Sequence, residues 1–289
     1  MFLGDAVVYQ KSLTVTATLT HVNASIPDTA PFGSSFITQL TADTDYFVNN
    51  SSVVVKMGGN DITTTAYNPT THTISIDSLT GNVEITAAAR VYEAEVTYLQ
   101  SDGTAYIDTG IKASSSIKIE ADIEVLSTFT GESCAIFGSR IANNNTAYAL
   151  QYYKTSSGTT KYWRWAFGNG SATANHNGTT GDFHLSNTTA SRSMVITGAH
   201  SSTATCSSAT FSNNYNIFIF GMNSGGTLGG VGGIPHVPVK AFKMYDGSSL
   251  ARDYIPVRKN GVGYLYDKVS GSLFGNANSS GAFTYGNDI

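Results

Sequence analysis

Residues 117–125, IKIEADIEV, alternate strictly between apolar and polar side chains. Successive side chains of an extended strand point to opposite faces, so this alternation predicts one buried face and one solvated face. The apolar face holds Ile117, Ile119, Ala121, Ile123 and Val125, and the polar face holds Lys118, Glu120, Asp122 and Glu124. The stretch is therefore predicted to be a half-buried β-strand that covers a core.

The same period of two recurs on both sides of this stretch. Residues 12–22, SLTVTATLTHV, set Leu13, Val15, Ala17 and Leu19 on one face and threonines on the other. Similar short runs, bounded by turn residues, continue to the end of the chain, and none has the period of a capped helix. The pattern predicts an all-β protein with a small β-sandwich first and a larger two-sheet jelly roll after it.

Composition and length agree with this division. The 289 residues suit one or two domains, only 12% of them are charged, and 29 Gly against 6 Pro supply turns. We expect an N-terminal attachment hairpin at 1–11, a spacer domain at 12–90 and a jelly-roll domain at 95–287. Residues 90–95, RVYEAE, form a short connector without Pro or Gly runs, which predicts a stiff joint.

Charge and hydropathy exclude several classes of partner. A net charge of −4, with 16 scattered Lys and Arg, provides no basic footprint for nucleic acid. No stretch approaches the roughly 20 apolar residues of a membrane helix, so no membrane insertion is expected. Cys134 and Cys206 lack metal-ligand spacing and are predicted to be buried free thiols.

The first predicted domain resembles a family of immunoglobulin-like repeats found in surface and phage structural proteins of Gram-positive and gut bacteria. The resemblance is carried by TLTHVNAS (18–25), FITQLTADTDYFV (36–48) and VVVKMGGNDITTTAYNPTTHTISIDSLTGNVEITAAA (53–89). It implies an immunoglobulin-like β-sandwich that spaces or displays another domain and has no catalytic activity.

The second predicted domain resembles the concanavalin A-like (laminin G-like) jelly roll that is common in phage tail and other virion proteins. The resembling segments are YLQSDGTAYIDTGI (98–111), FGSR (137–140) and VKAFKMYDGSSLARDYIPVRKNGVGYLYDKVSGSLFGN (239–276), and the opening MFLGDAVVYQ (1–10) resembles a hairpin that precedes such modules. The resemblance implies a place on the virion surface and binding, often of glycans, without naming a ligand.

One enzymatic alternative comes from Glu120, Asp122 and Glu124. On one face of a strand the two Glu Cα atoms are roughly 13 Å apart, and inward-leaning side chains reach the carboxyl separation of about 5.5 Å used by retaining glycosidases. This E-x-D-x-E also matches the catalytic strand of lichenase- and laminarinase-type hydrolases. The preceding SSSIKI has no aromatic sugar platform, so we favour a solvated sheet face over a glycoside hydrolase using Glu120 and Glu124.

Candidate ligand contacts gather around an aromatic strand, residues 161–167 (KYWRWAF). Alternation sets Trp163, Trp165 and Phe167 on one face and Tyr162 and Arg164 on the other, where they suit a glycan. A polar loop is predicted over 168–182, and binding residues tend to lie on such loops. The predicted loop contacts are Asn175, His176 and Asn177.

Other charged residues, which lie outside the aromatic strand, are candidate metal ligands or ion-pair partners by their type and spacing. His176, His184 and Asp182 have no fixed metal geometry, and no metal or other cofactor is expected. Calcium binding is implied only by analogy with laminin G-like domains, and Asp102 and Asp108 are the candidate calcium ligands on that analogy. Arg252, Asp253 and Arg258 match the closing strand of the resembling family and are predicted to form an ion-paired sheet face.

Together these features predict a bacteriophage virion surface protein of fiber, receptor-binding or decoration type, made in the host cytoplasm. Its partners would be other virion proteins and a bacterial surface glycan or receptor, reached by many weak contacts of a homo-oligomer such as a trimer. The alternatives are a purely structural head or tail fiber or cement subunit, and the glycosidase above.

Overall fold

A computed structural model describes residues 11–127, 134–141, 146–154, 161–176, 178–207, 210–229 and 237–289, without the side chains of 153 and 154. Residues 1–10 of the expected attachment hairpin (1–11) lie outside the described part. The chain divides into two compact units, Met1–Glu93 and Ala94–Ile289. Among the described residues, no helix has the length and apolar composition needed to cross a membrane.

Unit 1 is built from short strands around one apolar core. Its largest sheet runs β3 (Thr29–Pro31), β1 (Ser12–Thr20), β11 (Val83–Arg90), β7 (Val54–Met57) and β8 (Asn60–Asp61), with β6 (Phe47–Val48) paired to β11. The other pairings are β4 (Phe36–Gln39), β10 (Thr73–Ile76) and β9 (Tyr67–Asn68), and β2 (Val22–Asn23) with β5 (Thr41–Ala42). The only helical turns in the described part of this unit are α1 (Thr63–Ala66) and η1 (Asn50–Ser52).

The core of unit 1 follows the alternation of its strands. Leu13 and Val15 of β1 are buried beside Val83 and Ile85 of β11, a parallel neighbour that pairs Val15 with Val83. Ile74 of β10 joins the same core from the second sheet. Ala17 is exposed and Leu19 is only partly buried against the core, so the predicted apolar face of β1 is fully buried only at Leu13 and Val15.

Unit 2 consists of two large sheets. The first runs β22 (Ser202–Thr205), β21 (Ser193–Gly198), β20 (Gly181–Thr188), β15 (Ile117–Val125), β26 (Val239–Asp246), β27 (Ser249–Lys259), β28 (Val262–Asp267) and β29 (Ser272–Phe274), with β12 (Ala94–Glu95), β13 (Leu99–Ser101) and β30 (Phe283–Tyr285) attached. The second runs β14 (Ile107–Ser114), β23 (Ser212–Ile219), β16 (Cys134–Arg140), β17 (Ala147–Lys154), β18 (Lys161–Gly168) and β19 (Gly170–Asn175), with β24 (Asn223–Ser224) and β25 (Thr227–Leu228) attached.

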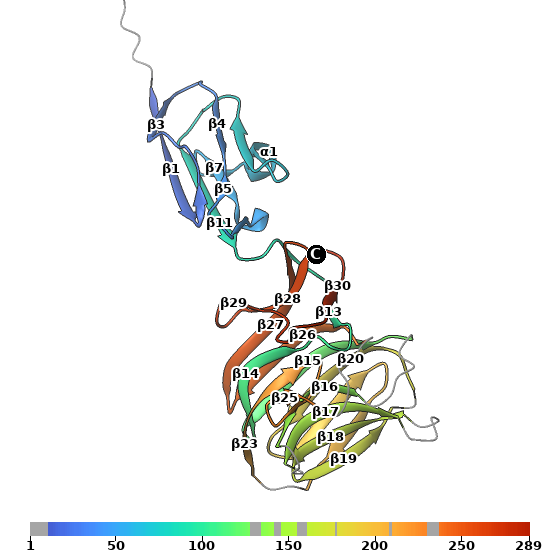
Figure 1. Cartoon of the computed structure of the whole chain (residues 1–289). Helices are drawn as coiled ribbons and strands as arrows, with labels where there is room; N and C mark the ends of the chain where they lie inside the picture. Colours follow the sequence, from blue (N-terminus) through green and yellow to red (C-terminus); the bar gives the residue numbers. More distant parts are fainter. Residues whose placement is uncertain are drawn as a thin grey trace, which may run out of the picture. The chain divides into compact units, whose positions relative to one another are not determined.

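The two sheets of unit 2 enclose a single aromatic core. Phe137 of β16 meets Phe242 of β26 edge to face, with ring centroids 5.5 Å apart, and both side chains are fully buried. Such edge-to-face pairs fix the two sheets against each other in a sandwich. The all-β fold class and its sandwich construction are thereby confirmed (Figure 1). Cys134 and Cys206 are buried as free thiols, as predicted.

Candidate functional site

The aromatic strand β18 divides its side chains between the core and the outer face as its alternation predicts. Trp163 and Trp165 have no exposed surface and Phe167 almost none, whereas Tyr162 and Arg164 are half-buried on the opposite side. The strand lies between β17 and β19 in the second sheet (Figure 1). Two neighbouring strands therefore hold the outward pair in place.

Cross-strand register brings further polar side chains to this outer face. Asn175 of β19 lies directly opposite Tyr162, while Thr173 of β19 and Gln151 of β17 lie opposite Arg164. Opposite residues in antiparallel strands share a face, with Cβ atoms about 5 Å apart. We call these residues, Gln151, Tyr162, Arg164, Thr173 and Asn175, the Arg164 face. It unites three of the five predicted contacts and adds Gln151 and Thr173, which the sequence did not single out.

Exposure within the Arg164 face is uneven. Thr173 and Asn175 are exposed, Arg164 is half-buried, and Gln151 is buried. Arg164 forms no hydrogen bond or ion pair within the described residues. The next row of the same sheet, Ala149 opposite Ala166, is buried in a small apolar cluster with Met222, so the face is bounded on that side.

The expected position of His176 on an exposed loop tip is wrong. Much of the predicted 168–182 loop is strand β19 and the start of β20, and the imidazole is fully buried among aromatic rings. Its Nδ1 lies 3.3 Å from the hydroxyl of Tyr152, and its ring centroid is 4.8 Å from that of Trp163 and 5.2 Å from that of Phe183. Burial, followed by the positive charges of His200 and Lys161, lowers the pKa of His176 to about 4. Asn177 lies outside the described residues.

The carboxylates of β15 form a paired row on the outer face of the other sheet. Glu120 accepts from Lys118 and from the hydroxyl of Tyr245, the latter at 3.1 Å. Asp122 lies 2.7 Å from Nδ1 of His184, and Glu124 lies 3.0 Å from Nζ of Lys240. Each carboxylate of the predicted polar row therefore has a partner.

The environment of Glu120 stabilises its ionised form. The hydrogen bond from Lys118 is the main cause that lowers its pKa; burial opposes this shift, and the hydrogen bond from Tyr245 adds to it. A glycosidase general acid needs the opposite, a raised pKa that keeps it protonated. The residues considered for a metal are also engaged, because His184 pairs with Asp122 and Asp182 lies 2.6 Å from Lys240.

Asp102, one of the calcium candidates, holds a turn in the described structure. Its Oδ1 accepts from the backbone N–H groups of Thr104 and Ala105, and its Oδ2 accepts from Ala282 at 2.7 Å. Burial raises the pKa of Asp102, but these hydrogen bonds outweigh burial and bring it to about 2. Asp108 accepts from Gly110 N–H at 2.9 Å. Both carboxylates thus accept from backbone donors of their own turns, and Asp102 also accepts from the distant Ala282.

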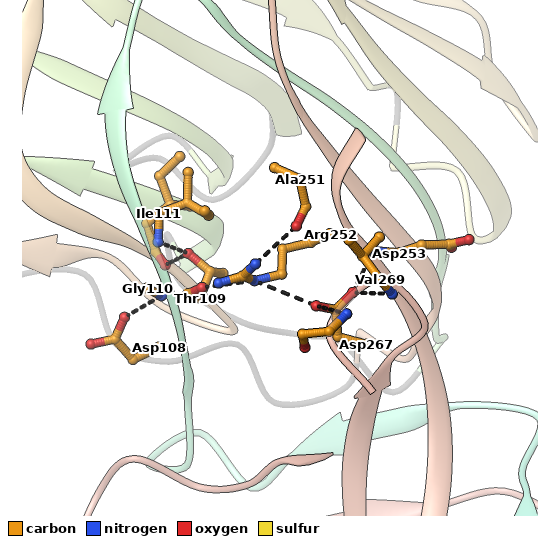
Figure 2. A network of polar contacts seen from close by, with 11 residues as sticks. Asp108, Thr109, Gly110, Ile111, Ala251, Arg252, Asp253, Asp267 and Val269 are labelled. Atoms are coloured by element: carbon orange, nitrogen blue, oxygen red, sulfur yellow. Dashed lines mark hydrogen bonds and ion pairs between the residues drawn. The ribbon is translucent and has the colours of Figure 1, made fainter. Parts of the chain in front are cut away.

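Arg252, Asp253 and Arg258 each form an ion pair, as predicted, but with partners outside this set; one of these partners is the buried Asp267, which the sequence did not single out. Figure 2 shows Arg252 between the carbonyl of Thr109, which accepts from its Nε at 3.2 Å, and the carboxylate of Asp267, 3.7 Å away. Asp253 pairs with Lys268 at 3.3 Å. The two remaining partners are Arg258 and Asp288, 2.7 Å apart. The start of the turn DKVSG (267–271) was the available signal, since Asp commonly caps such turns.

Comparison with known proteins does not establish a family. No family model and no curated protein matches this chain. Among solved structures, the mouse laminin alpha1 chain, domains LG4-5, is similar with a TM-score of 0.39 and 16% identity. The similarity covers 61% of this chain and 48% of the laminin chain, so this chain spans about half the length of that structure. A candidate carbohydrate-binding protein from Bacteroides ovatus ATCC 8483 is similar with a TM-score of 0.40 and 11% identity, over 95% of this chain and 97% of that one. Because the identities and TM-scores are this low, the function of this chain is inferred from its own side chains.

Proposed function

We propose that this chain is a glycan-binding protein and that unit 2 contacts its ligand through the Arg164 face. The observation that carries the proposal is the placement of Tyr162 and Arg164 side by side on the outer face of β18, opposite Asn175 and Thr173 of β19. An aromatic ring offers an apolar surface to the C–H face of a sugar, and the amide, hydroxyl and guanidinium groups offer hydrogen bonds to its hydroxyls.

The reverse side of the same strand makes this face rigid. Trp163 and Trp165 are fully buried directly behind it, and the indole of Trp165 donates to the carbonyl of Arg192 at 3.1 Å. A binding face fixed by a packed core loses little conformational entropy when a ligand arrives. Such a face suits recognition of a repeating surface polymer by several copies of one protein.

The proposed activity is binding without hydrolysis. The paired carboxylates of β15 and the lowered pKa of Glu120 favour a solvated ion-pair row over a catalytic pair. Purified protein should release no reducing ends from β-glucans. Release that disappears in Glu120→Gln would contradict this part of the proposal.

The proposal extends to a place on a phage particle, supported by the sequence resemblances of both domain segments to virion proteins. Several copies, for example a trimer, would raise the avidity of a weak site, with unit 1 acting as a spacer to other virion proteins. An antibody against the chain should label purified particles and block their adsorption to host cells. Recovery of the chain only from the cell envelope would contradict the particle assignment.

A panel of immobilised bacterial polysaccharides tests the binding proposal directly. The full chain should be retained by at least one of them, and Tyr162→Ala should weaken retention by about tenfold because it removes the stacking surface. Tyr245→Ala is the matched control, since it removes a half-buried tyrosine from the outer face of the opposite sheet. Equal effects of the two variants, or no retention on any polysaccharide, would sink the proposal.

A further inference from the structure

We infer that the ligand of the Arg164 face is an acidic glycan, with Arg164 binding a carboxylate or sulfate group of the sugar. This inference rests on the proposed function and deepens it, because it names the chemical class of the ligand. Its basis is the lack of polar contacts between the Arg164 guanidinium and the other described residues, together with the charges on the strands around it.

Arg164 lies on a strand of the sheet, but its guanidinium makes no polar contact with the described residues that would stabilise the sheet. The residue is half-buried, yet its guanidinium makes no hydrogen bond or ion pair within the described part of the chain. Its cross-strand neighbours, Gln151 and Thr173, are neutral. A partly desolvated cation without an anion is unfavourable, so the free protein keeps a place for a negative group.

The strands around Arg164 contain no acid that would compete for it. Residues 133–181, which span β16 to β19, include no Asp or Glu, in a chain that has 20 acidic residues. The same segment contains the basic residues Arg140, Lys154, Lys161 and Arg164. This local positive excess, on a protein of net charge −4, favours the approach of an anionic ligand to these strands.

Several cations of the opposite sheet are used in structural ion pairs. Lys118 pairs with Glu120, and Lys240 bridges Glu124 and Asp182. Arg252 pairs with the buried Asp267. These ion pairs of the described part of unit 2 lie on the first sheet, and Arg164 of the second sheet takes part in none of them.

The geometry of arginine fits the inferred ligand. A guanidinium donates two parallel N–H bonds to a carboxylate or a sulfate, which fixes orientation as well as charge. Tyr162 and Asn175 form the next row of the same face, so a sugar ring whose acidic group binds Arg164 would lie over them. A neutral glycan would use the flanking side chains and leave the arginine without its anion.

Matched polymers provide the test on the full chain. Hyaluronan and polygalacturonate carry carboxylates, and their carboxyl-reduced forms have the same backbone without charge; dextran sulfate and dextran form the corresponding pair for sulfate. We expect affinity for at least one charged polymer to exceed that for its neutral form by about tenfold or more, as one charge-assisted contact provides. The pair that responds distinguishes carboxylate from sulfate.

Two charge-removing variants separate a specific site from general attraction. Arg164→Gln should lose that tenfold preference, and Arg164→Lys should keep only part of it because the bidentate geometry is gone. Lys243→Gln, which removes a half-buried cation from the outer face of the opposite sheet, should bind like the parent. Unchanged tryptophan fluorescence of each variant shows that the core behind the face is intact.

The outcomes distinguish this inference from the proposed function. Binding of neutral polysaccharides with full affinity by both the parent and Arg164→Gln would overturn the inference and leave glycan binding standing. Equal losses in Arg164→Gln and Lys243→Gln would show general charge attraction and also overturn it. No binding to any charged or neutral polymer would overturn both proposals.

Discussion

Arg164 and Arg252 show how the surroundings of a residue decide its role. Both are half-buried arginines on strands of unit 2. Arg252 donates to the carbonyls of Thr109 and Ala251 and lies near a buried carboxylate, so its charge stabilises the fold. Arg164 has no such partners within the described residues, so its charge remains available to a ligand.

At the same scale, His176 predicts a pH dependence of stability. Its pKa is lowered from 6.5 to about 4 in the folded protein. Between these values the unfolded chain binds a proton that the folded chain does not, so stability falls as pH drops from 6.5 towards 4. We expect a loss of about 2 kcal/mol, measured by urea unfolding followed by tryptophan fluorescence.

Variants of two histidines check this assignment. His176→Phe should flatten the pH dependence, because the aromatic packing stays and the titrating group is removed. His184→Gln, in which an exposed imidazole is replaced, should keep the slope of the parent. A slope that survives in His176→Phe would assign the pH dependence to another group.

The residue scale also shows what the sequence was able to predict about the site. Strict alternation in KYWRWAF placed Tyr162 and Arg164 outward correctly, because large apolar side chains marked the opposite face. His176 was misplaced because the apolar positions before it are only Ala172 and Ala174, whose small side chains give little hydrophobic signal. Extending the period of two from these alanines sets His176 on the buried face.

At the scale of elements, a buried carboxylate links a turn to the neighbouring strand. Asp267, at the end of β28, accepts from the backbone of Asp253 on β27 at 2.8 Å and from Val269 and Ser270 of the following turn (Figure 2). The alternation of β28 predicts the strand, but it contains no information on which N–H groups the carboxylate reaches. Register, which the sequence did not provide, decides that.

Asp267→Asn is expected to destabilise unit 2 by about 2–4 kcal/mol, because it removes the charge beside Arg252 and places an amide N–H2 against backbone donors. The residue is fully buried, so water cannot replace the lost interactions. The midpoint of urea unfolding, followed by tryptophan fluorescence, measures the change.

An exposed ion pair provides the matched control for this substitution. Asp288 pairs with Arg258 through 2.7 Å and 2.8 Å hydrogen bonds, and about half of its side chain is exposed. Asp288→Asn should cost about 1 kcal/mol or less, because solvent screens the pair. Equal losses in the two variants would contradict the role assigned to buried Asp267.

At the scale of the whole molecule, the described residues form one large apolar core in each unit, in addition to the small cluster around Ala149 in unit 2. The core of unit 1 includes Ile74 and Ile85, the core of unit 2 includes Ile123 and Phe242, and the two share no residue. Alternation and turn spacing predicted the all-β class and the sandwiches because both depend on local patterns. The pairing of β1 with β11, in which partners such as Val15 and Val83 lie 68 residues apart along the chain (83 − 15), depends on long-range contacts that these patterns do not contain.

Separate cores predict separate unfolding transitions in the intact chain. The only two tryptophans, Trp163 and Trp165, lie in the core of unit 2, so their fluorescence reports that unit. Ile123→Ala should lower the tryptophan-detected stability by about 2–5 kcal/mol through loss of buried surface and a cavity, and Ile74→Ala should leave it unchanged. In calorimetry, Ile74→Ala should instead shift the transition that tryptophan does not report. If Ile74→Ala moved the tryptophan transition as far as Ile123→Ala does, the two units would unfold as one, and the spacer role proposed for unit 1 would lose its basis in an independent core.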